Sequence, residues 1–102
     1  MSKLEELRQS IDQIDQELVR LFERRMAVTR EVGEYKQQVG LPVLDAARER
    51  EVLAKKLNLI SNPDLQADVV QLYENIMAIS RRQQRSLVLE GQENPYLTKI
   101  LG

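Results

Sequence analysis

The sequence predicts an all-α protein with three helices in each chain, the first of them very long. Apolar residues recur three and four positions apart, which is the period of an amphipathic helix, and no segment alternates apolar and polar residues as a strand does. Glycine, proline and asparagine fall between the apolar runs, where they would end one helix and start the next. Of the 102 residues, 42% are hydrophobic and only 4% are aromatic, which suits one helical domain.

The first helix is expected over residues 4–39. Ser2 and Glu5 have the spacing of a capping box before it, and Gly40 followed by Pro42 marks its end. Gly33 lies inside the helix and costs about 1 kcal/mol of propensity, which a helix of this length tolerates. One apolar seam runs along it, formed by Leu4, Leu7, Ile11, Ile14, Leu18, Leu21, Val28, Val32, Tyr35 and Val39.

The length of this helix predicts an entwined homodimer. At 1.5 Å per residue, residues 4–39 span about 55 Å, whereas a compact domain of this size has a radius of gyration of about 13 Å. The rest of the chain is too short to cover the whole seam. A second copy of the chain would have to bury much of it.

Two shorter helices follow, over about 46–60 and about 63–89. Asp45 is the expected N-cap of the second helix, Asn62 can cap the third, and Pro63 suits a first helical position. The apolar faces are Val52, Leu53, Leu57 and Ile60 on the second helix, and Leu65, Val69, Leu72, Tyr73, Ile76, Ile79 and Leu87 on the third.

Residues 1–89 therefore form the predicted helical domain, and residues 90–102 are a tail. Gly91 and the pair Asn94-Pro95 are expected to break the third helix. The tail would either pack loosely on the domain or begin a linker to another domain, so both a free-standing protein and a domain of a fusion remain open.

Composition excludes several classes of function. The chain contains neither histidine nor cysteine, which excludes imidazole bases, thiol chemistry, disulfides and the usual zinc sites, and we expect no metal. The net charge of −1, without a basic stripe, argues against a nucleic-acid partner. The charged start MSKLEELRQS is unlike a signal peptide, and no segment reaches membrane-spanning length. We therefore expect a cytoplasmic protein without a membrane partner.

Arg25 interrupts the seam of the first helix, and three explanations compete. It could form a buried ion pair that fixes register, its head could extend into solvent, or it could line a pocket and bind an external anion. Lys36 follows eleven residues later, about 16 Å along the same side of the helix, so both side chains could reach one small molecule. Alone, Lys36 would read as a solvated flank.

Other polar residues are weaker signals when taken singly. Arg8 lies about 25 Å before Arg25 along the helix, so it could serve only the site of another subunit, and it could equally be a surface arginine. Ser80 and Gln84 continue the apolar stripe of the third helix, where buried polar groups need partners, unless that end of the helix has reached the surface. The charged start of the second helix, Asp45, Arg48 and Glu49, resembles an ordinary solvated face.

Together these residues resemble the all-helical class of chorismate mutase. The likeness covers residues 4–88 and rests on LRQSIDQIDQELVRLFERRMAVTREVGEYK, then GLPVLDAARER, then ISRRQQ. Each piece alone is weak, whereas the ordered set with its spacing is specific.

The resemblance implies an entwined homodimer with two equivalent sites that isomerise chorismate to prephenate, in phenylalanine and tyrosine biosynthesis. This Claisen rearrangement is intramolecular and needs no cofactor or metal. By this resemblance, Arg25 and Arg8 of the partner subunit would bind the substrate carboxylates. Lys36 and Gln84 would donate hydrogen bonds to the ether oxygen. Glu49 would accept a hydrogen bond from the ring hydroxyl, with Asp45 nearby, and Arg48 and Ser80 would complete the polar shell. The implied catalytic residues are Lys36, Gln84, Arg25 and Glu49.

Two alternatives remain at this point. An isochorismate-pyruvate lyase on the same scaffold would act on a similar dianion by a pericyclic step. A non-catalytic helical dimerisation module would use the long seam, although Arg25, Ser80 and Gln84 do not suit a simple zipper.

Overall fold

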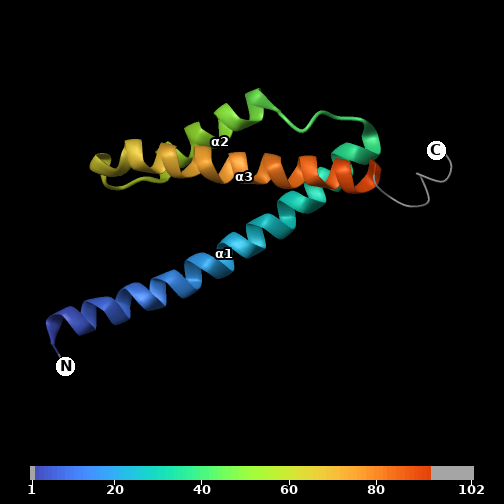
Figure 1. The fold of residues 1–102 in the computed structure, drawn as a ribbon. Coiled ribbons are helices and arrows are strands. Elements are labelled where there is room, and N and C mark those ends of the chain that lie inside the picture. Colours follow the sequence, from blue (N-terminus) through green and yellow to red (C-terminus); the bar gives the residue numbers. More distant parts are fainter. Residues whose placement is uncertain (1, 93–102) are drawn as a thin grey trace.

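The computed structural model describes residues 2–92, which contain three α-helices, one short 3-10 helix and no strand. The helices are α1 (Lys3–Val39), α2 (Ala46–Leu59), η1 (Pro63–Leu65) and α3 (Gln66–Gln92) (Figure 1). The all-α class and the long first helix are therefore confirmed. No helix within residues 2–92 combines the length and apolarity that crossing a membrane requires.

The ends of α1 and the start of α2 follow the predicted capping residues. The side chain of Ser2 accepts a hydrogen bond from the backbone N–H of Glu5 at 3.1 Å. Gly40 has a φ of 75°, a left-handed conformation that favours glycine, and its N–H donates to the carbonyl of Lys36. The carboxylate of Asp45 accepts from the backbone N–H of Arg48 at 3.0 Å and so caps α2.

The third helix differs from its prediction at both ends. Asn62 and Pro63 start a single 3-10 turn before the α-helix begins at Gln66. The prediction that Gly91 breaks the helix is wrong, since α3 continues to Gln92. A single glycine lowers helix propensity by only about 1 kcal/mol, which does not by itself end a helix. The predicted break at Asn94-Pro95 lies outside the described residues.

The helices form an open arrangement around α3. Both α2 and the C-terminal part of α1 pack on α3, while the N-terminal half of α1 diverges from it (Figure 1). The radius of gyration is 18.7 Å, with extents of 64 × 33 × 16 Å, compared with about 13 Å for a compact domain of this length.

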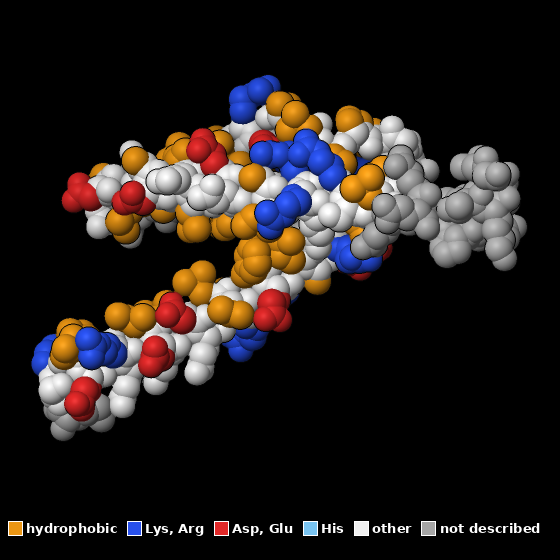
Figure 2. All heavy atoms as spheres, in the orientation of Figure 1, with side chains coloured by type: hydrophobic (Ala, Val, Ile, Leu, Met, Phe, Trp, Pro, Cys, Tyr) orange, Lys and Arg blue, Asp and Glu red, His pale blue; other side chains and the backbone are white. Residues whose placement is uncertain are grey.

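The chain buries few side chains by itself. Among the residues whose burial the structure describes, the buried apolar side chains are Val52, Met77 and Leu87, and Gly33 is the only buried residue of α1. All ten seam residues of α1 stay between 41% and 60% exposed. In the space-filling view, apolar side chains line the side of α1 that faces α3 across the open angle between the two helices (Figure 2). An uncovered apolar stripe of this length marks an interaction surface.

Candidate active site

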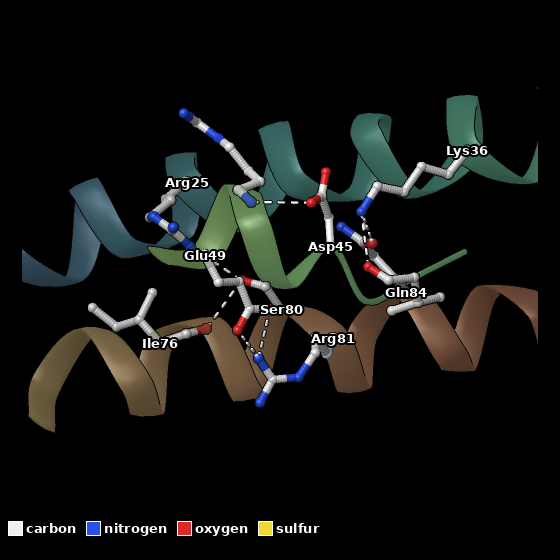
Figure 3. Close-up of polar contacts among 10 residues, drawn as sticks. Arg25, Lys36, Asp45, Glu49, Ile76, Ser80, Arg81 and Gln84 are labelled. Atoms are coloured by element: carbon white, nitrogen blue, oxygen red, sulfur yellow. Dashed lines mark hydrogen bonds and ion pairs between the residues drawn. The ribbon is translucent and has the colours of Figure 1, made fainter. Parts of the chain in front are cut away.

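A cavity of about 310 Å³ lies where the C-terminal half of α1, the start of α2 and the C-terminal half of α3 meet. This volume is at the lower end of the range for small-molecule sites. Seven of the eight residues singled out in the sequence line it, namely Arg25, Lys36, Asp45, Arg48, Glu49, Ser80 and Gln84. Figure 3 shows Arg25 and Lys36 on α1, Glu49 on α2, and Ser80, Arg81 and Gln84 on α3.

Arg25 is held at the cavity by a hydroxyl group. Its Nη1 donates to Oγ of Ser80 at 3.1 Å, and that hydroxyl donates to the carbonyl of Ile76 at 3.0 Å (Figure 3). Ser80 is only 7% exposed, so both of its hydrogen-bonding roles are used inside the protein. A guanidinium has five N–H groups, and a neutral hydroxyl does not compensate its charge. Arg25 therefore keeps donors and positive charge for an anion.

Lys36 and Gln84 form a second polar group. Nζ of Lys36 donates to the carbonyl of Val43 at 2.8 Å and to Oε1 of Gln84 at 3.4 Å (Figure 3). The amide Nε2 of Gln84, which is 6% exposed, donates to the carbonyl of Thr29 at 3.1 Å. An ammonium has three N–H groups and a side-chain amide has two. Each residue therefore keeps one further donor beyond these contacts.

The start of α2 supplies the carboxylates. Glu49 accepts from Nη1 of Arg81 on both oxygens, at 2.5 and 2.6 Å, and both side chains are about one quarter exposed (Figure 3). Asp45 lies one turn earlier, where its carboxylate also caps α2.

Arg48 lines the cavity from a more exposed position. Its Nη1 pairs with Glu51 at 2.9 Å, and both side chains are more than half exposed. Lys55 and Arg48 beside Glu51 hold the pKa of that carboxyl below its ordinary value. Exposed pairs of this kind are weak, so Arg48 can exchange Glu51 for a ligand at little cost.

Arg8 does not reach this cavity. It lies on the exposed N-terminal part of α1, about 25 Å from Arg25 along the helix axis. The structure thus separates Arg8 from the other seven residues within one chain.

Sequence reasoning missed two polar residues of the site, Arg81 and Thr29. Arg81 lies beside Ser80 at the end of the third helix, which the sequence allowed to reach the surface, yet it lines the cavity and pairs with Glu49. Its position three residues before Gln84, on the same face of the helix, was the signal available in the sequence. Thr29 lines the cavity, and its hydroxyl lies 3.0 Å from Oε1 of Gln83, which joins α1 to α3. Its sequence position carried no signal of this kind.

The cavity is positively charged with apolar walls. Its four cationic and two anionic side chains leave a net positive charge of two. The arrangement can bind a small dianion and, near Lys36 and Gln84, donate hydrogen bonds to an oxygen. The apolar lining residues are Val28, Val32, Val43, Val52 and Met77.

Residues 7–85 of the chain match the chorismate mutase type II family. A bifunctional chorismate mutase/prephenate dehydratase of Aquifex aeolicus is 42% identical over 59 residues, which are 58% of this chain and 16% of that protein. The T-protein of Haemophilus influenzae is 34% identical over 71 residues, 70% of this chain and 19% of the relative. A chorismate mutase of Methanocaldococcus jannaschii is 25% identical over 93 residues, 90% of this chain and 94% of the relative. The chain thus spans less than a fifth of the first two relatives and nearly all of the third.

Proposed function

The chain belongs to the chorismate mutase type II family, and from this we propose that it isomerises chorismate to prephenate as a cytoplasmic homodimer. The observation that carries the proposal is the cavity, whose net charge of two matches a substrate with two carboxylates. In addition, Lys36 and Gln84 each keep a donor at one end of it.

Binding would use the arginines. Arg25 is anchored by Ser80 and presents a planar guanidinium, which matches the geometry of a carboxylate better than an ammonium does. Arg48 would add a contact by releasing its exposed partner Glu51. These contacts would hold the enolpyruvyl arm of the substrate over the ring, in the conformer that reacts.

Rate acceleration would come from the hydrogen-bond donors of Lys36 and Gln84. As the C–O bond of the allyl vinyl ether breaks and a C–C bond forms within the same molecule, negative charge develops on the ether oxygen. The remaining N–H groups of Lys36 and Gln84 would stabilise that charge, and their existing contacts to Val43 and Thr29 keep them oriented before reaction.

Glu49 would accept a hydrogen bond from the ring hydroxyl. A carboxylate has about four lone-pair sites, and Arg81 uses two of them, so the others can serve the substrate. Asp45 would contribute to the same polar end of the cavity.

The homodimer would complete the site. The exposed seam of α1 offers a second copy a long apolar surface, and its N-terminal half carries Arg8 away from its own cavity. An antiparallel partner helix would bring its Arg8 toward the cavity of the first chain. Arg8 of the partner subunit would then bind a substrate carboxylate.

The test is the conversion of chorismate by the purified protein. Chorismate should disappear far faster than in a buffer blank, and prephenate should be the product, with no pyruvate released. Absence of turnover, or faster pyruvate release from isochorismate than prephenate formation from chorismate, would overturn the proposal.

A further inference from the structure

Gly33 is the buried residue of α1, and its backbone lies against side chains of α3. A Cβ atom added at this position would lie 2.7 Å from Cγ of Gln84, 3.1 Å from Cδ1 of Leu87 and 3.3 Å from Cβ of Gln84. A separation below 3.0 Å is not tolerated without movement, and two of these three atoms belong to the stem of Gln84. The glycine thus leaves the space in which the Gln84 stem lies against the α1 backbone.

The position of this stem determines where the amide of Gln84 can reach. Its Nε2 donates to the carbonyl of Thr29, one turn before Gly33, and its Oε1 accepts from Lys36, one turn after Gly33. The amide therefore bridges two groups of α1 on either side of the glycine. Moving the stem outward would lengthen both contacts together.

We propose that Gly33 is a positioning residue that allows the amide of Gln84 to lie in hydrogen-bonding reach of Thr29 and Lys36. The role rests on the proposed function, because it matters for catalysis only if Gln84 donates to the reacting ether oxygen. Gly33 itself offers no group to the substrate and acts through Gln84.

The first variant is Gly33→Ala. The substitution should raise the helix propensity of α1 but worsen the packing of α1 against α3. Alanine favours a helix over glycine, which strengthens α1, while its Cβ displaces Gln84. Since a displacement near 1 Å can cost on the order of 100-fold in rate, we expect kcat to fall about 10- to 100-fold. KM should change only a few-fold, because the arginines are unchanged.

The control is the same substitution in a Gln84→Ala background. Alanine at position 84 has no Cγ, so the 2.7 Å approach disappears. Adding Gly33→Ala to that background should leave the residual kcat nearly unchanged. An equal fold-loss in both backgrounds would show a merely structural role and overturn the proposal.

The remaining outcomes are also informative. A Gly33→Ala enzyme with wild-type kcat overturns the proposal while the proposed function stands, and an inactive wild type removes the proposed function itself. If Gly33→Ala is destabilised, the double variant should be the more stable of the two, because its closest contact is relieved. A double variant no more stable than Gly33→Ala would overturn the proposal.

Discussion

Nη1 of Arg81 lies 2.5 and 2.6 Å from the two carboxylate oxygens of Glu49, and this contact joins α3 to the first turn of α2. Both side chains are about one quarter exposed, so the pair is screened less than a surface ion pair. It fixes the direction of the one carboxylate that the proposed mechanism uses as an acceptor.

Replacing Arg81 by leucine should reduce kcat/KM by about 10-fold and the stability by about 1 kcal/mol. Glu49 would lose the donor that orients it, and a partly buried charged group without its partner is costly. Steady-state kinetics and thermal unfolding measure both effects. Arg82→Leu is the matched control, since Arg82 is exposed and does not line the cavity. Equal effects of the two variants would contradict a specific role for Arg81.

Lys36→Ala should remove most turnover while the protein stays folded. Loss of one preorganised donor to a developing negative charge costs about 3–4 kcal/mol, or two to three decades in rate. Circular dichroism checks the fold, and chorismate disappearance measures the rate. Lys55→Ala is the control, because Lys55 forms an exposed ion pair with Glu51 outside the cavity and should keep wild-type turnover. Retained activity in Lys36→Ala would remove Lys36 from the ether-oxygen role.

Gln84→Glu should shift activity toward acid pH. An ionised carboxylate at this position would repel negative charge on the ether oxygen, whereas the protonated acid has an O–H that can donate to it. The rate of the variant should therefore rise as the pH falls and the acid form becomes populated. Gln84→Ala has no titratable group and should lack this rise. Identical pH profiles for Gln84→Glu and the wild type would argue against donation by Gln84.

Mixed dimers of Arg8→Ala and Arg25→Leu should recover activity that neither variant has alone. If Arg8 serves the partner's cavity, each mixed dimer contains one site with both arginines intact. Random mixing would then restore about one quarter of wild-type activity per total protein. If Arg8 serves its own subunit, no site in the mixed dimer is intact and nothing is restored.

Arg25→Leu alone also tests the alternative of a non-catalytic helical dimerisation module. That alternative predicts greater stability of the variant and no loss of function.

The candidate site shows how far sequence reasoning reached. Seven of the eight residues that the family resemblance singled out line one cavity. Spacing alone had suggested a pocket position only for Arg25, Ser80 and Gln84. Arg81 was missed because α3 has arginines at positions 81, 82 and 85. The sequence does not show which of the three side chains points toward the cavity. Which of them meets Glu49 depends on how α2 lies across α3, and that is not a local property.

The sequence by itself determined the three helices, both ends of α1 and the start of α2. Helix ends depend on local features: the spacing of apolar residues, the capping side chains of Ser2 and Asp45, and the left-handed conformation available to Gly40. Each of these acts over a few residues and needs no tertiary context. Tertiary structure alone decided the meaning of Gly33, which the sequence presented only as a loss of helix propensity. In the folded chain it is a point where the stem of Gln84 on α3 lies against the backbone of α1. The physical reason is that helix formation depends on neighbours in the chain, whereas the effect of a missing Cβ depends on which atoms of the folded protein occupy that space.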